Sequence, residues 1–514
     1  MHYNLPVLRR RSLAFSAFAV ALLAATPASA TIRYSVSLAN RSGSRFHVRM
    51  EVPAVHGSLD VAMPVWNALY QVRDFASRIE QLHAEQAPAS PVILRRTSPH
   101  SWQAGPASGT VTFDYLITWD DPGPFASELT PEHAFMNLAM ILLYVPDRRA
   151  EDVALELKDI PAGWRVATAL DPGSAPATFV APGYDALVQA PVEAGSFYDF
   201  SFEQSGRPVT VVVHTSPMAG PAPEFWSRAH LEDAARRIVR TETALMGDVP
   251  FPRYVFLMHL GIGGGGMEHP NSTAIGVAPG QDPTLVMAHE FFHLWNVLRI
   301  RPQSLEPVDY TREQPTDTLW FAEGVTSTIA SYTMLRSGLW NRDAFYRDLG
   351  GEIQALESRP ARRYQSVEDA SIAAWLEKYP AYRGRDFSIS YYNKGQLLGL
   401  CLDILLREAT DNRESLDTLL RAMNVRFAQA HKPYGDTAAI QALAEELAGR
   451  SLADFFQRYV AGTDEVPFDD ILARGGFALQ RSADPAGGPV HYHVSDARVS
   501  GLPRTIRESI LTGK

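Results

Sequence analysis

The pentapeptide HEFFH at residues 289–293 holds the residues of this sequence with the clearest potential for chemistry. Asp282, a favoured helix N-cap, and a proline precede it, which predicts that a helix starts there. In a helix His289 and His293 lie one above the other on one face. Two such imidazoles can share one metal ion, and Glu290 beside them can reach a metal-activated water. A buried helix with two hydrogen-bonded histidines and an exposed glutamate is the alternative.

A catalytic zinc usually has three protein ligands and an open fourth position, and Glu323 is the best candidate for the third ligand. It lies in the apolar segment LWFAEG at residues 319–324, 30 residues after His293. A carboxylate in such a segment is costly to bury unless it is paired or bound to metal. This separation fits a helix, a long loop and a second antiparallel helix. We therefore expect one zinc ion bound by His289, His293 and Glu323. A glutamate facing solvent from an amphipathic helix is the alternative.

A glycine-rich segment at residues 261–280 contains another candidate carboxylate, Glu268. We expect this segment to be a loop after a strand at 250–260. The glycines at 263–266 allow close backbone approach, so an extended peptide could lie along the neighbouring sheet edge. A carboxylate beside a metal site can bind a free α-amine through a charge-assisted hydrogen bond. No GK[ST] follows, which disfavours phosphate binding. A solvated loop carboxylate is the alternative for Glu268.

Several motifs together resemble the glycyl aminopeptidase family of zinc metallopeptidases, peptidase family sixty-one, which is of the gluzincin type. The resemblance rests on HEFFHLWN at 289–296, RIRP at 299–302, LWFAEG at 319–324, GGMEH at 265–269 and YYNKG at 391–395. Weaker similarity extends to AMPVWNALYQVRDFA at 62–76 and EHAFMNLAMILLYV at 132–145. Members of the family commonly end in a PDZ domain, and residues 475–514 are too few to form one.

The resemblance implies a thermolysin-like catalytic domain with zinc on His289, His293 and Glu323, and with Glu290 as the general base. Tyr392 is the implied donor to the tetrahedral oxyanion, and Tyr391 is its alternative. The implied substrate-binding segment comprises Gly265, Gly266, Met267, Glu268 and His269. Within it, Glu268 would bind the substrate amine, and His269 would orient Glu268 or shape the pocket.

The beginning of the chain is typical of a secretory signal peptide. Three arginines at 9–11 precede an apolar stretch and the small residues Ala28, Ser29 and Ala30. We expect residues 1–30 to direct export, to the bacterial periplasm, and an uncleaved anchor is the alternative. No later segment is apolar and long enough to span a membrane. We therefore expect no integral membrane segment after signal cleavage.

Composition narrows the remaining classes. The 514 residues carry a formal charge of −10, which argues against a nucleic-acid partner. Cys401 is the single cysteine, so neither an internal disulfide nor a cysteine zinc site holds the chain together.

The pattern of apolar residues predicts a multidomain α+β protein. Strand-like segments, including residues 139–146 and 208–216, predict a sandwich-like all-β domain over 31–217. A thermolysin-like domain over 218–345 and a helical domain over 346–475 follow, with apolar helices at 284–298, 317–335, 391–409 and 451–462. Residues 476–514 are expected to form a polar tail with two strands.

The first functional hypothesis is therefore a zinc aminopeptidase that releases small N-terminal residues, of the Gly or Ala type, from peptides with a free N-terminus. A thermolysin-like endopeptidase is the second hypothesis, because it would use the same metal and base. A non-catalytic peptide-binding protein on a peptidase fold is the third. Such a protein would usually have lost a ligand or the base, and all four residues are present here.

Overall fold

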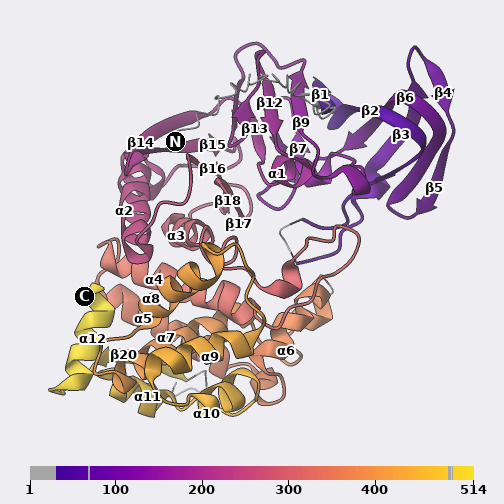
Figure 1. Cartoon of the computed structure of the whole chain (residues 1–514). Helices are drawn as coiled ribbons and strands as arrows, with labels where there is room; N and C mark the ends of the chain where they lie inside the picture. The colour runs from indigo at the N-terminus through magenta and orange to yellow at the C-terminus, as the bar shows by residue number, and fades with distance from the viewer. Residues whose placement is uncertain (1–30, 68–69, 379, 484–487, 489) are drawn as a thin grey trace, which may run out of the picture.

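The computed structural model describes residues 31–514 except 68–69, 379, 484–487 and 489, so the expected signal segment lies outside the described residues. The chain forms a β-rich N-terminal region, a central α/β region and a helical C-terminal region (Figure 1). Two buried apolar clusters form the core, one mainly within the N-terminal region and one that joins the central sheet to the helices. This arrangement confirms the expected multidomain α+β class.

Two sheets make up the N-terminal region. The larger sheet has nine strands, β1 (Ile32–Asn40), β2 (Arg45–Ala62), β3 (Ile79–Gln86), β4 (Ser90–Val92), β5 (Leu94–Ser98), β6 (Ser101–Thr118), β9 (Val153–Lys158), β11 (Asp171–Pro172) and β12 (Thr178–Ala181). The smaller has four, β7 (Glu128–Leu129), β8 (His133–Met136), β10 (Arg165–Thr168) and β13 (Val192–Gly195), and α1 (Tyr184–Val188) lies between β12 and β13 in the chain. The prediction of a β-rich N-terminal region is thereby confirmed.

The apolar run at residues 139–146 is not a strand, contrary to the prediction. It forms a short 3-10 helix (Leu138–Met140) and then an irregular segment, joined to β2 only by a bridge between Ala62 and Tyr144. Every side chain from Leu138 to Val145 is buried. Complete burial makes all positions apolar whatever the backbone conformation, so the pattern could not reveal it.

The central sheet has the order β14-β15-β16-β18-β17, with strands β14 (Tyr198–Gln204), β15 (Arg207–Thr215), β16 (Tyr254–Leu260), β17 (Gly265–His269) and β18 (Ser272–Val277). The middle strands β15, β16 and β18 are parallel. Because β14 and β15 belong to this sheet, it begins before the expected domain boundary at residue 217. The glycine-rich segment, expected to be a loop, forms an antiparallel hairpin in which β17 is the edge strand. Ladder hydrogen bonds with β18 outweigh the low strand propensity of its glycines.

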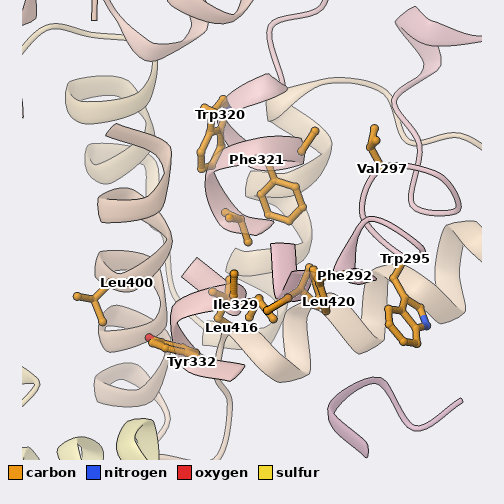
Figure 2. Close-up of a cluster of buried hydrophobic side chains, with 14 of the residues drawn as sticks. Phe292, Trp295, Val297, Trp320, Phe321, Ile329, Tyr332, Leu400, Leu416 and Leu420 are labelled. Carbon is orange, nitrogen blue, oxygen red and sulfur yellow. The ribbon is translucent and has the colours of Figure 1, made fainter. Parts of the chain in front are cut away.

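Helices cover the sheet and build the C-terminal region (Figure 1). They are α2 (Arg228–Met246), α3 (Thr284–Phe292), η7 (Trp320–Val325, a π-helix), α4 (Thr326–Arg336), α5 (Arg342–Glu357), α6 (Val367–Ile372), α7 (Tyr391–Ala409), α8 (Leu416–Met423), α9 (Thr437–Ala448), α10 (Ala453–Phe455) and α11 (Phe468–Arg474). The helix expected at 284–298 ends at Phe292, and the backbone hydrogen bonds that follow are irregular, reaching carbonyls three to five residues back. Large aromatic side chains, among them Phe292, Trp295 and Phe321, pack together near its end (Figure 2).

The C-terminal segment is ordered and partly buried, and not merely a polar tail. The two expected strands are present as the hairpin of β19 (Phe477–Ser482) and β20 (His491–Asp496). A helix, α12 (Leu502–Thr512), follows and was not predicted. Its Ile506 and Ile510 are fully buried, and the Arg336 guanidinium on α4 donates to the Ile510 carbonyl. No helix among the described residues is both long and apolar enough to cross a membrane.

Candidate metal centre

Three predicted ligands converge at one point. The Nε2 atoms of His289 and His293 lie 3.0 Å apart. One carboxylate oxygen of Glu323 lies 3.3 Å from His289 Nε2 and 3.1 Å from His293 Nε2. His289 lies in the last turn of α3, His293 is its C-cap residue, and Glu323 comes from the helical segment η7.

The other ring nitrogens show which way the two imidazoles are protonated. The Nδ1–H of His293 donates to the Asn296 carbonyl over 2.7 Å. The Ser327 hydroxyl donates to the Glu323 carbonyl, so its oxygen accepts from His289 Nδ1 over 3.2 Å. Both Nε2 atoms therefore face each other and the Glu323 carboxylate, where a proton or a metal ion can bind. Such an arrangement of donor atoms fits a divalent cation bound to two nitrogens and a carboxylate.

The charged side chains around the three predicted ligands also favour a positive charge between them. Burial disfavours the charged form of His293, yet the carboxylates of Glu323 and Glu268 raise its pKa to about 10. Burial likewise opposes ionisation of Glu323, but His293 and His289 hold the pKa of that carboxyl far below its usual range. A buried carboxylate is stabilised here only because cationic or metal-binding groups surround it.

Glycines allow the helix that carries Glu323 to pack closely against α7. A Cβ on Gly324 would lie 2.4 Å from Gly395 Cα, and a Cβ on Gly395 would lie 2.3 Å from the Trp320 carbonyl oxygen. Side chains at these positions would force α7 away from η7. The YYNKG motif therefore has a packing role as well as the implied chemical one.

The same helix presents the two candidate tyrosines differently. Tyr392 is 40% exposed, and its ring centroid lies 5.9 Å from that of His289. Tyr391 is 4% exposed, and its ring is tilted by 31° against that of Tyr392, with the centroids 4.8 Å apart. Both residues line the same cavity. Tyr392 is therefore the one whose ring faces the metal centre with access to solvent.

Glu290 lies between the metal centre and the edge strand β17. A Cβ on Gly266 would lie 2.3 Å from the Glu290 carboxylate carbon, so only glycine leaves room for that carboxylate. Its Oε2 is buried and has no hydrogen-bond partner among the described residues. Burial raises the pKa of Glu290 well above its usual value, and the carboxylates of Glu268 and Glu323 raise it further. The group is thus a strong proton acceptor.

The predicted substrate-binding segment is strand β17, and four of its five residues line the cavity. Gly265, Gly266, Met267 and Glu268 contribute to the wall. Burial raises the pKa of Glu268 to about 7. His269 does not line the cavity: it is buried on the other side of the strand, where Nδ1 lies 3.1 Å from Gln189 Oε1. Alternation along a strand explains this, because residues 268 and 269 must face opposite sides.

The metal centre opens into a cavity of about 380 Å³. The N-terminal region contributes Tyr70, Gln71 and Phe125 to its wall, which sequence reasoning missed. The helical region adds further acidic side chains, namely Asp348, Glu352 and Glu377. No lysine or arginine is among the described lining residues, so the cavity is strongly acidic. The weak similarity at 62–76 was the only sequence signal that pointed to Tyr70.

A deep cavity with a two-histidine, one-glutamate centre on a thermolysin-like arrangement of sheet and helices defines the class of metallopeptidases. A family model described as M61 glycyl aminopeptidase matches residues 284–398, and a model of the Peptidase M61 N-terminal domain matches residues 33–196. The protein belongs to this family and is a metallopeptidase with aminopeptidase activity. The N-terminal match ends directly before β14, as does the N-terminal pair of sheets.

Solved structures show the same fold. An aminopeptidase N family protein from Idiomarina loihiensis is 24% identical, with a TM-score of 0.81 over 88% of this chain and 80% of that chain. An M1 zinc metallopeptidase from Deinococcus radiodurans is 15% identical, with a TM-score of 0.52 over 85% of this chain and 94% of that chain. A variant of the latter enzyme has been solved with a Tyr-Ser-Ala substrate, at 12% identity and a TM-score of 0.50 over 85% of this chain and 94% of that chain. No curated protein sequence matches the chain.

The contact between Gly266 and Glu290 gives a test with a matched control. We expect Gly266→Ala to lower kcat by about 100-fold or more, because the added methyl group displaces a carboxylate placed for proton transfer. Metal content should not change, because the atoms nearest to a Cβ on Gly266 all belong to Glu290 and not to the three ligands. Gly264→Ala is the control, since its Cβ would meet only Gln281 Oε1, at 3.8 Å. Peptidase kinetics and metal analysis decide, and equal activity of the two variants would contradict the assignment.

Proposed function

We propose that this protein is an exported, periplasmic zinc aminopeptidase that releases small N-terminal residues, of the Gly or Ala type, from peptides. One observation carries the proposal: two imidazole nitrogens and a buried carboxylate oxygen converge within 3.3 Å in a cavity that also contains Glu290 and Glu268. The family supports the preference for small residues, and the peptide bound by the Deinococcus radiodurans variant supports peptides as substrates.

His289, His293 and Glu323 would hold the zinc ion. When bound, zinc supplies a Lewis acid that lowers the pKa of water and polarises a carbonyl group. Ser327 and the Asn296 carbonyl keep the two imidazoles oriented through their Nδ1 atoms. The Asn296 amide also donates to the Phe321 carbonyl over 2.9 Å, which ties the end of α3 to η7. Asn296 is therefore a positioning residue for both parts of the centre.

Glu290 moves the proton in the proposed reaction. Its Oε2 takes a proton from the attacking water and then gives it to the leaving amine. Tyr392, at the mouth of the centre, donates its hydroxyl proton in a hydrogen bond to the oxyanion of the tetrahedral intermediate.

Glu268 binds the free α-amine at the end of the substrate. It lies on edge strand β17, so a peptide can add to the sheet beside it while its amine meets the carboxylate. The acidic wall formed by Asp348, Glu352 and Glu377 also favours a cationic chain end over an anionic one. An endopeptidase would have no amine to place there.

Replacement of the base tests the proton transfers. We expect Glu290→Gln to lower kcat by about 1,000-fold, because glutamine cannot accept the proton, while zinc binding persists on the other three side chains. The measurement is steady-state kinetics with zinc analysis of the same preparation. Retained zinc with unchanged turnover would refute the role of Glu290.

The two adjacent tyrosines form a matched pair. Tyr392→Phe should lower kcat by about 100- to 1,000-fold with little change in KM, because only the oxyanion loses a hydrogen bond. Tyr391→Phe should change kcat far less. The opposite ranking of the two variants would move the oxyanion role to Tyr391.

Blocked substrates test the recognition of the amine. Wild-type protein should cleave a Gly or Ala anilide far faster than its N-acetylated form, and Glu268→Gln should reduce this preference about tenfold or more by weakening the charge-assisted hydrogen bond. The same panel with larger N-terminal residues tests the preference for small ones. Faster cleavage of the acetylated form would favour the endopeptidase.

A further inference from the structure

A second group of buried histidines and glutamates does not line the cavity and lies where the four-stranded sheet of the N-terminal region meets the central sheet (Figure 1). His133 is on β8 and Glu193 is on the neighbouring strand β13. His259 is on β16 of the central sheet and pairs with His214 of β15. His133, Glu193 and His259 are each at most 2% exposed. The proposed function uses none of them.

The two oxygens of Glu193 each face one histidine. Oε1 lies 2.6 Å from His133 Nε2, and Oε2 lies 2.9 Å from His259 Nε2. The possible ligand atoms of the three residues all lie within 4.8 Å of one another, as do those of the HEFFH residues. One possible ligand atom from each of the three residues thus lies near a common point.

A further carboxylate orients the first histidine. The Glu128 carboxylate lies 3.0 Å from His133 Nδ1, and because an ionised carboxylate only accepts, Nδ1 is the donor. The other ring nitrogen, Nε2, then faces Glu193. A carboxylate that orients a ligand histidine in this way is the usual second contact of a metal site.

The short contact between His133 Nε2 and Glu193 Oε1 needs a proton or a metal ion to balance the two lone pairs. Within the described part of the chain, neither atom has a hydrogen-bond partner of acceptable geometry, although they lie 2.6 Å apart. A proton on Nε2 would have to lie along the ring N–H direction, which does not point at the oxygen. A metal ion lies off the line between two ligand atoms and needs no such alignment.

The charges around the cluster point the same way. Two buried carboxylates, Glu193 and Glu128, face the two ring nitrogens of His133. His214 stacks on His133 with ring centroids 3.9 Å apart. A cation beside Glu193 would balance the negative charge that these two carboxylates bring together.

We propose that His133, Glu193 and His259 bind a second divalent metal ion, of the zinc type, that joins the N-terminal region to the central sheet. Imidazole nitrogens with a carboxylate suit zinc and its neighbours in the first transition series. The ligands are buried and occupy the approach to the ion from both sheets, so its role is structural. The ion links strands that are 126 positions apart in the chain, at residues 133 and 259.

The decisive experiment leaves this cluster unchanged. The full-length variant His289→Ala/His293→Ala lacks the peptidase ligands, and after zinc loading and gel filtration we expect it to retain about one zinc per chain, against about two in wild-type protein. Crystals of the variant should give an anomalous zinc peak between β13 and β16. A variant with no tightly bound zinc and no peak would overturn the proposal, and the cluster would then be a proton-holding ion-pair network.

A second pair of variants locates the ion. His259→Gln in the otherwise wild-type chain should lose about one of the two zinc ions, and His214→Gln, which removes a neighbour outside the three ligands, should keep both. If His259→Gln fails to fold, the loaded His289→Ala/His293→Ala variant still decides, because its Tm should fall on removal of zinc by a chelator. Zinc counts are independent of activity, so failure of the peptidase proposal would leave this test intact.

Discussion

The burial of Glu323 is the constraint on which the centre of the molecule depends. Its side chain is 3% exposed within a π-helix whose neighbouring residues are apolar, and an isolated charge there would be strongly destabilising. His289 and His293 make the position tolerable, so α3 and η7 must keep a fixed separation. Asn296 maintains it with hydrogen bonds to Phe321 and Thr326. The aromatic side chains near the end of α3 pack beside α3 and η7, whose separation these charged side chains determine (Figure 2).

Glycines allow the elements that carry the other functional side chains to pack closely against α3 and η7. Contact between Gly324 and Gly395 brings α7, and with it Tyr392, against the metal centre. Gly266 brings the edge strand that carries Glu268 against Glu290. In each case the absence of a side chain on glycine allows a close approach to the neighbouring element. Tyr392 and Glu268 therefore reach the site from elements beside the HEFFH helix. Strand and helix packing thus determine distances that the motif alone leaves open.

Local patterns predicted the parts of the site that are local in the chain. The i, i+4 spacing of His289 and His293 and the apolar surroundings of Glu323 were sufficient to predict the ligand set that the structure brings together. The hairpin of β17 and β18 was missed because its strands are stabilised by pairing and have weak intrinsic propensity. Tyr70 and Phe125 were missed as cavity residues because only tertiary packing brings them there. The cluster of His133, Glu193 and His259 has no local motif at all.

The N-terminal region is part of the active site and not an appendage. Trp66 donates from Nε1 to the Asp309 carbonyl over 2.7 Å and packs edge-on against Trp375 of the helical region at 5.3 Å. Tyr70, four residues later, meets the same Trp375 at 6.2 Å and forms cavity wall. These contacts place N-terminal side chains opposite the helices across the acidic cavity. A carboxylate at the edge strand of this cavity suits the end of a peptide better than its middle. The docking of the N-terminal region therefore bears directly on the choice between exopeptidase and endopeptidase.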